Sequence, residues 1–139
     1  MEKIIQAGNL TKVYGEKETS VTALDNIDVQ FNENEFTAIM GPSGSGKSTL
    51  LHCLAGLDRP TSGQILLKDQ DISTLNDKQL TKIRRDSFGF VFQAFNLIPT
   101  LTAEENITLP ASIAGRKPDM DWIKPVSYTH LTLPTMFEV

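Results

Sequence analysis

One segment of nine residues, Gly41–Thr49, constrains the fold of this chain more than any other feature. It reads Gly-Pro-Ser-Gly-Ser-Gly-Lys-Ser-Thr and fits the pattern G-x-x-x-x-G-K-[ST]. The short apolar run Phe36–Met40 precedes it, and leucines at helical spacing follow it at Leu50, Leu51, Leu54 and Leu57. This order predicts a buried strand, a glycine-rich turn and a helix, in that sequence along the chain.

The residue types in this segment suit a phosphate cradle. Glycines allow successive backbone N–H groups to point at one anion, and the following helix adds the positive end of its dipole. Lys47 can reach the β- and γ-phosphates of a nucleotide, and the Ser48 hydroxyl can ligate Mg²⁺. An ordinary glycine-rich turn before a helix is the alternative. We predict phosphate binding by Gly41, Pro42, Ser43, Gly44, Ser45, Gly46, Lys47, Ser48 and Thr49.

The rest of the chain alternates strand and helix patterns. Thr102-Ala-Glu-Glu105 has the spacing of a capping box, so a helix is expected to begin there, and Pro110 should limit or kink it. A polar helix is expected over Asn76–Asp86. Further strands are expected at Lys3–Val13, Ile27–Phe31, Gln64–Leu67 and Phe88–Phe92. This order predicts an α/β fold.

Composition limits the classes of function. The 139 residues suit one domain, and a net charge of −4 gives no basic excess that would favour nucleic acid as a partner. Cys53 is alone, so no internal disulfide can form. No apolar run reaches the roughly 18 residues of a membrane span, and the start does not resemble a signal peptide. We expect a cytoplasmic location, with membrane contact only through a partner.

Several blocks around the cradle strongly resemble the nucleotide-binding domains of ABC transporters. The resemblance runs from about Lys3 to Lys117. Within the family, the subgroup that the sequence resembles is that of the macrolide-export, lipoprotein-release and antimicrobial-peptide-resistance ATPases. Its blocks are Lys12–Gly15, Ala23–Ile27, Gly41–Thr49, Gly56–Gly63, Gly89–Gln93 and Phe95–Thr102. The resemblance implies an ABC-type P-loop NTPase core, here incomplete, with antiparallel β elements at the N-terminus.

The resemblance also implies roles for individual residues. Tyr14 would stack on the adenine of ATP, and Gln93 would ligate Mg²⁺ or orient the attacking water, so that Gln93 and Lys47 are the catalytic candidates. The segment Phe95–Leu101 would contact an integral-membrane permease. Two such subunits would form a homodimer around two ATP molecules. The alternatives are an ordinary strand-end tyrosine, a surface amide, and core packing by Leu97 and Ile98.

Parts that this family uses to hydrolyse ATP are missing from the sequence. It contains no Leu-Ser-Gly-Gly-Gln signature, no strand ending in Asp-Glu and no switch histidine in a family-like setting. We therefore interpret residues 1–125 as the N-terminal part of a nucleotide-binding domain. Residues 126–139 can be encoded by DNA that resembles a sequencing-library adapter, and we interpret them as a non-native tail; a divergent natural C-terminus is the alternative.

These observations predict an ATP-binding subunit that couples ATP binding and hydrolysis to export of a peptide, lipoprotein or drug-like cargo. We expect this fragment to bind nucleotide weakly and to turn over little. We also expect it to aggregate or stay partly unfolded, because the strand at Phe36–Met40 lacks its parallel neighbours. The alternative function is that of a cell-division ATPase relative, which regulates wall enzymes. A kinase-like P-loop enzyme is disfavoured by the blocks around Tyr14 and Gln93.

Overall fold

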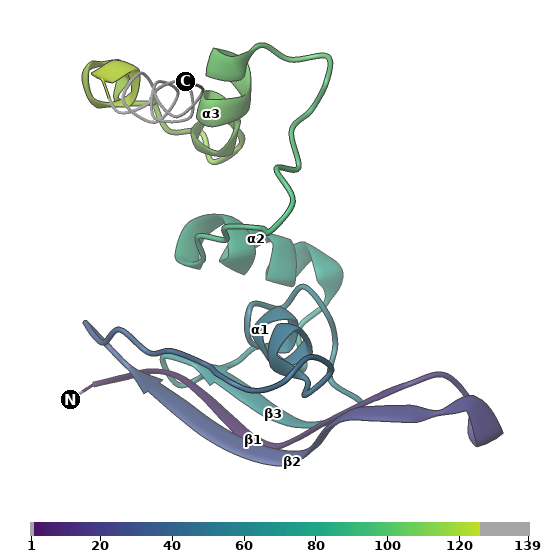
Figure 1. Ribbon diagram of the computed structural model, residues 1–139. Coiled ribbons are helices and arrows are strands. Elements are labelled where there is room, and N and C mark those ends of the chain that lie inside the picture. Colours follow the sequence, from purple (N-terminus) through teal and green to yellow (C-terminus); the bar gives the residue numbers. More distant parts are fainter. Residues whose placement is uncertain (1, 126–139) are drawn as a thin grey trace. The chain divides into compact units, whose positions relative to one another are not determined.

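The computed structural model describes residues 2–125, which belong to two compact units (Figure 1). The first unit extends to Arg84 and the second begins at Arg85. The proposed non-native tail, residues 126–139, lies outside the described residues, so its origin stays a prediction.

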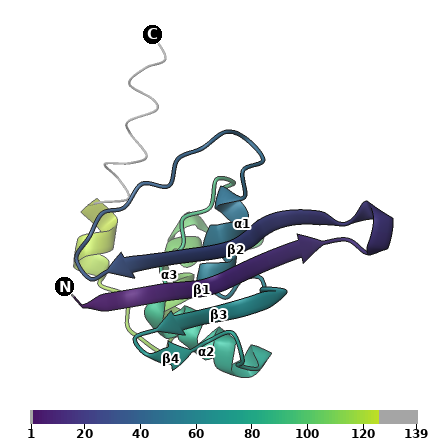
Figure 2. The ribbon, with the colours of Figure 1, turned by 90° about the horizontal axis from the view of Figure 1, so that it is seen from below.

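The first unit is built on a four-stranded sheet with the order β2-β1-β3-β4 (Figure 2). Every neighbouring pair in this sheet is antiparallel, which confirms the expected N-terminal architecture. A single turn of 3-10 helix, Lys17–Thr19, connects the two longest strands. The strands are β1 (Lys3–Tyr14), β2 (Val21–Asn32), β3 (Ser62–Leu67) and β4 (Gln70–Asp71).

Side-chain alternation places one face of β1 in the core. Ile5 and Ala7 are buried, and the register then shifts between Ala7 and Leu10, where Asn9 adopts a φ of 49°. Such a bulge inserts an extra residue, so that Leu10 returns to the core face and is 0% exposed. The bulge therefore keeps the apolar side chains of β1 on the core face on both sides of Asn9.

Helix α1 (Lys47–Leu54) lies against one face of this sheet, as Figures 1 and 2 show from two directions. Its buried residues are Cys53 and Leu54, and the free thiol Cys53 packs there as a small hydrophobic side chain. Helix α2 (Asp77–Ser87) contacts the segment that follows α1: the guanidinium of Arg84, in its last turn, donates a hydrogen bond of 2.7 Å to the Gly56 carbonyl. The predicted helices after the cradle and over Asn76–Asp86 are thus confirmed.

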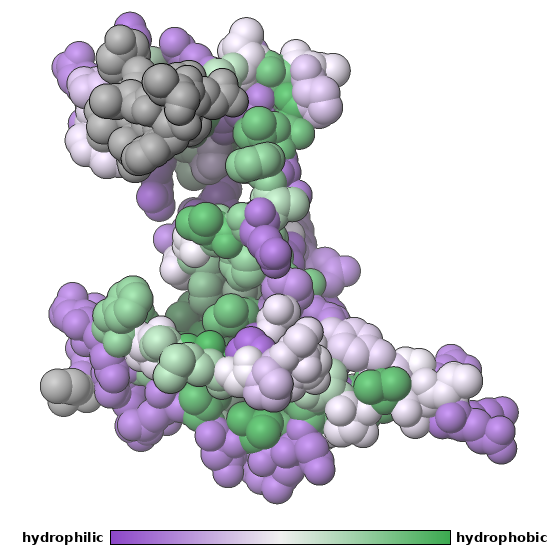
Figure 3. All heavy atoms as spheres, in the orientation of Figure 1, coloured by the Kyte–Doolittle hydropathy of each residue, from purple (hydrophilic) through white to green (hydrophobic). Residues whose placement is uncertain are grey.

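Two predicted strands, Phe36–Met40 and Phe88–Phe92, are wrong for this structure. Both segments have an extended or irregular backbone without strand pairing. An apolar run becomes a strand only when another strand supplies hydrogen-bond partners, and neither segment joins the sheet of the first unit. Their side chains remain open: Phe36 is 97% exposed and Val91 is 97% exposed, and hydrophobic residues are visible on the surface in Figure 3.

The second unit contains helix α3 (Ala103–Ile113), which begins with the predicted capping box. The Thr102 hydroxyl accepts a hydrogen bond from the Glu105 N–H, and the Glu105 carboxylate accepts one of 2.7 Å from the Thr102 N–H. Pro110 lies inside the helix, which continues to Ile113. Within residues 2–125, no helix has both the length and the apolar character needed to cross a bilayer.

Candidate functional site

The predicted cradle connects the segment after β2 to the first turn of α1. Gly46 is the N-cap of α1 and has a φ of 86°, a left-handed conformation that favours glycine. A Cβ atom at this position would collide with the carbonyl oxygen of Ala23 on β2. Gly46 therefore allows the loop to lie directly on the backbone of the sheet, which fixes where α1 starts.

The first turn of α1 presents backbone N–H groups that the helix itself does not use. The first hydrogen bond inside the helix joins the Leu50 N–H to the Gly46 carbonyl, at 2.8 Å. The N–H groups of Lys47, Ser48 and Thr49 precede it, at the positive end of the helix dipole. This arrangement suits an anion, as the sequence pattern predicts.

The Lys47 side chain closes the loop on itself. Its ammonium donates hydrogen bonds to the Gly41 carbonyl at 2.8 Å, the Pro42 carbonyl at 2.6 Å and the Ser45 hydroxyl at 3.2 Å. These three contacts use the three N–H donors of an ammonium group. A triphosphate in the loop would compete for the same donors, so Lys47 is placed to exchange loop acceptors for phosphate oxygens.

The outer part of the loop is open to a ligand. Pro42, Ser43, Gly44 and Ser45 are exposed, and Gly44 has a φ of 80°. A Cβ atom at Gly44 would meet nothing within 4 Å, so there is open space beside this glycine. The residues present thus fit a phosphate chain at this loop. Ser48, the predicted Mg²⁺ ligand of the motif, is exposed in the first turn of α1.

Tyr14, the predicted adenine contact, belongs to the same unit and lies at the end of β1. It is 42% exposed, so part of its ring is accessible. Its hydroxyl donates a hydrogen bond of 2.7 Å to Asp58 Oδ2, and the Lys12 ammonium lies 4.8 Å from the ring centroid. The hydrogen bond to Asp58 and burial raise the pKa of Tyr14, while a hydrogen bond with Thr49 opposes the rise. The hydrogen bond to Asp58, whose own N–H donates to the His52 carbonyl, connects the tyrosine ring to the helix of the cradle.

Gln93 and the segment Phe95–Leu101 belong to the second unit. Gln93 is exposed in an irregular stretch, and its roles as Mg²⁺ ligand and water-orienting residue stay predictions. Phe95 is 92% exposed, Leu97 65% and Ile98 40%. These values do not agree with core packing of Leu97 and Ile98, which was the alternative to a contact surface.

Asn106 on α3 holds this exposed segment, a role that the sequence analysis missed. Its Oδ1 accepts a hydrogen bond of 2.8 Å from the Ile98 N–H. Its amide nitrogen lies 3.2 Å from the carbonyls of Ile98 and Leu101 and 2.9 Å from that of Thr102. An asparagine one helical turn after the N-cap residue is a signal that could have indicated these hydrogen bonds to the preceding loop.

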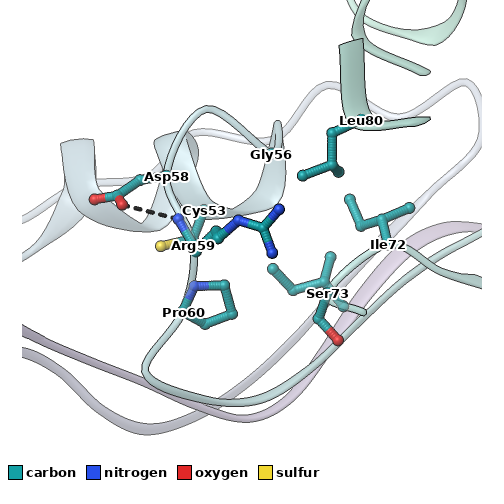
Figure 4. Close-up of a pocket in the computed structure, with 9 residues that line it drawn as sticks. Cys53, Gly56, Asp58, Arg59, Pro60, Ile72, Ser73 and Leu80 are labelled. Carbon is teal, nitrogen blue, oxygen red and sulfur yellow. Dashed lines mark hydrogen bonds between the residues drawn. The ribbon is translucent and has the colours of Figure 1, made fainter. Parts of the chain in front are cut away.

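A small cavity between α1, β3 and α2 is lined by residues such as Cys53, Ile72 and Leu80 (Figure 4). Its volume of about 10 Å³ is no larger than one water molecule needs, so it offers no ligand site. Within residues 2–125, no three His, Cys, Asp or Glu side chains gather as a metal-binding group. The candidate site is the loop at Gly41–Thr49, which carries the lysine, the hydroxyl and the helix N–H groups that suit a phosphate chain.

Comparison with known proteins supports the resemblance to the nucleotide-binding domains of ABC transporters. The profile of the ABC transporter family matches residues 24–133. The macrolide export ATP-binding/permease protein MacB of Marinobacter nauticus is 48% identical over 115 residues, which are 83% of this chain and 18% of MacB. The lipoprotein-releasing system ATP-binding protein LolD of Cytophaga hutchinsonii is 47% identical over 116 residues, which are 84% of this chain and 51% of LolD.

Solved structures show the same fold. The dimeric ATP-binding cassette MJ0796, in a post-hydrolysis state bound to ADP and Pi, superposes with a TM-score of 0.77 and 48% sequence identity. The superposition covers 82% of this chain and 49% of the cassette, so the chain spans about half the length of these ATP-binding relatives. The match of the family profile, which covers most of the sequence, shows that the chain belongs to the ABC transporter family of ATP-binding proteins.

Proposed function

We propose that this chain is the N-terminal part of the ATP-binding subunit of an ABC transporter that exports a peptide, lipoprotein or drug-like cargo. The observation that carries the proposal is the loop at Gly41–Thr49. It rests on the backbone of β2 at Gly46 and places one lysine ammonium and three free helix N–H groups at one open site. The similarity to MacB and LolD, named for macrolide export and lipoprotein release, supports export.

In this proposal the first unit binds the nucleotide and orients it. Lys47 neutralises charge on the β- and γ-phosphates, and the backbone N–H groups at the start of α1 donate hydrogen bonds to the phosphate oxygens. Tyr14 provides a flat surface for adenine. Ser48 would ligate Mg²⁺, which would supply charge neutralisation at the phosphates when bound. Gln93 would either ligate Mg²⁺ or orient the water that attacks the terminal phosphate.

The proposed partners are a second nucleotide-binding subunit and an integral-membrane permease. The dimeric form of the MJ0796 cassette supports the first, and the permease portion in MacB supports the second. The exposed apolar side chains of Phe95–Leu101, braced by Asn106, supply the contact with the permease. Through it, the subunit would be attached to the cytoplasmic face of the membrane.

ATP turnover in the complete subunit tests the proposal. The reading frame would be extended past Pro125 from the source DNA, and phosphate release would be measured with Mg-ATP. We expect Lys47→Ala and Gln93→Ala each to reduce turnover, Lys47→Ala through lost binding and Gln93→Ala through a lower kcat. Turnover that is unaffected by both substitutions would contradict the proposed site. The 139-residue chain itself should release no phosphate above background.

The identity of the permease separates export from regulation of wall enzymes. A membrane protein that co-purifies with the complete subunit, and no longer does so after Phe95→Ser, would identify the partner. An exporter permease supports the proposal. If the partner is instead a division-type membrane protein that directs wall enzymes, the function is regulation of those enzymes and not export.

A further inference from the structure

A cluster of polar side chains surrounds Tyr14 and has no part in the phosphate cradle. Lys12 lies two residues before Tyr14 on β1, while Asp58 follows the C-terminal end of α1. The Lys12 ammonium and Asp58 Oδ1 form an ion pair of 2.8 Å, and their side chains are only 13% and 32% exposed. A charged pair that is largely removed from water needs well-placed hydrogen-bond partners.

Both charges in this pair have further partners. The Lys12 ammonium donates a hydrogen bond of 2.7 Å to the Arg59 carbonyl, and the Arg59 N–H donates one of 2.8 Å to Asp58 Oδ1. Figure 4 shows this second bond, with the Arg59 side chain directed away from Asp58 towards Ile72 and Leu80. The N–H of Asp58 in turn donates to the His52 carbonyl at 3.2 Å, which ties the cluster to the last turn of α1.

The cluster fixes the tyrosine ring at two points. Asp58 Oδ2 accepts the Tyr14 hydroxyl at 2.7 Å, which holds the tip of the ring. The Lys12 ammonium lies over the ring, 4.8 Å from its centroid, which covers one face with a favourable cation–π contact. A ring held at its tip and covered on one face can offer only the opposite face to a flat ligand.

We propose that Lys12 and Asp58 are positioning residues for nucleotide recognition: they hold the Tyr14 ring so that a purine stacks on the face opposite Lys12. The proposal rests on the proposed function, since it takes Tyr14 as the contact for the base. It adds that base recognition depends on the helix that carries the phosphate cradle, because Asp58 is anchored to the end of α1. Pre-organisation of the ring lowers the entropy lost on binding.

Binding of Mg-ATP and of Mg-tripolyphosphate to the complete subunit, measured by titration calorimetry, tests this role. Tripolyphosphate has the phosphates but no base. We expect Lys12→Met, Asp58→Asn and Tyr14→Phe each to weaken Mg-ATP binding about threefold to fivefold, which corresponds to the loss of one cation–π contact or hydrogen bond. None of the three should change the affinity for Mg-tripolyphosphate.

Controls separate positioning from general damage. Lys68→Met removes a different lysine, which forms an ion pair of 3.9 Å with Glu33 away from Tyr14, and should leave both affinities unchanged. The pair of substitutions Tyr14→Phe and Asp58→Asn should together weaken Mg-ATP binding no more than Asp58→Asn alone, because Tyr14→Phe removes a hydrogen bond that Asp58→Asn already removes. Equal losses for both ligands would show a structural role and overturn the proposal.

Tyr14→Ala distinguishes failure of this proposal from failure of the proposed base site. It should weaken Mg-ATP binding about tenfold, since it removes the stacking surface itself. If it does so while Lys12→Met and Asp58→Asn bind Mg-ATP like the wild type, positioning is wrong and the base site stands. If Tyr14→Ala also binds Mg-ATP like the wild type, the base site at Tyr14 is wrong and the positioning role falls with it.

Discussion

Strand β1 and the segment Phe36–Met40 both carry the apolar side chains of a buried strand, but only β1 is buried. β1 pairs with β2 through a short connection and with β3, so its hydrogen-bond partners are close in the chain. Phe36–Met40 joins no strand of the described residues, and Met40 remains 88% exposed. A hairpin thus provides its own partner, whereas a run that needs parallel neighbours depends on distant parts of a protein.

The largest effect on stability should come from the core of the hairpin sheet. Leu10→Ala removes a side chain that is 0% exposed and leaves a cavity, so we expect it to lower the free energy of opening of β1 by about 2–5 kcal/mol. Phe36→Ala is the matched control and should change it by less than about 0.5 kcal/mol, because Phe36 is 97% exposed. Hydrogen exchange of the β1 amides measures both; similar losses would remove the contrast between the two regions.

The next largest loss of stability is expected for substitutions in the Gly41–Thr49 loop, which follows Phe36–Met40 and rests on β2. Gly46→Ala combines a φ of 86° with a collision against the Ala23 carbonyl, so we expect a loss of about 2–3 kcal/mol in the opening free energy of α1. Gly44→Ala has a similar φ but open space around its Cβ position and should cost about 1 kcal/mol. The order of the two losses, again from amide exchange, is the result to check; equal losses would show that contact with β2 does not fix the loop.

Helix α3 of the second unit contrasts with the buried strand β1, because α3 has no buried residue and depends on local hydrogen bonds. Thr102→Ala removes the N-cap acceptor and should lower the stability of α3 by about 1 kcal/mol. Exchange of the amides in Ala103–Ile113 should accelerate, while that of β1 stays unchanged. An equal effect on β1 would mean that the two units are stabilised together.

The smallest effect is a pH dependence at Asp58. Burial raises the pKa of its carboxyl, but hydrogen bonds from Lys12 and Tyr14 outweigh burial and leave the pKa below its ordinary value of 3.8. A carboxyl with a lowered pKa in the folded chain stabilises the fold above 3.8, and this contribution is lost as the pH falls through the lower, folded value. The stability difference between wild type and Asp58→Asn should therefore shrink below about pH 4; a difference that grows on acidification would contradict the sign.

Local signals in the sequence predict much of this molecule. The capping box at Thr102 and the helix after the glycine-rich turn each depend on residues close together in the sequence, and each is found where expected. Apolar runs predict burial without naming the partner strand, which is why Phe36–Met40 and Phe88–Phe92 were assigned wrongly. The pair Lys12 and Asp58 could not be found in this way, since 46 residues separate them and only the fold brings them together.

The central claim is that backbone amides between Gly44 and Thr49 surround a triphosphate. Amide chemical shifts of the complete subunit, followed by NMR during titration with Mg-ATP, test this most directly. The account predicts that the amides of Gly44, Gly46, Lys47, Ser48 and Thr49 shift together with one Kd, and that Lys47→Ala abolishes these shifts at the same nucleotide concentration. The account would be contradicted if the signals of these amides did not shift, or if they still shifted in Lys47→Ala.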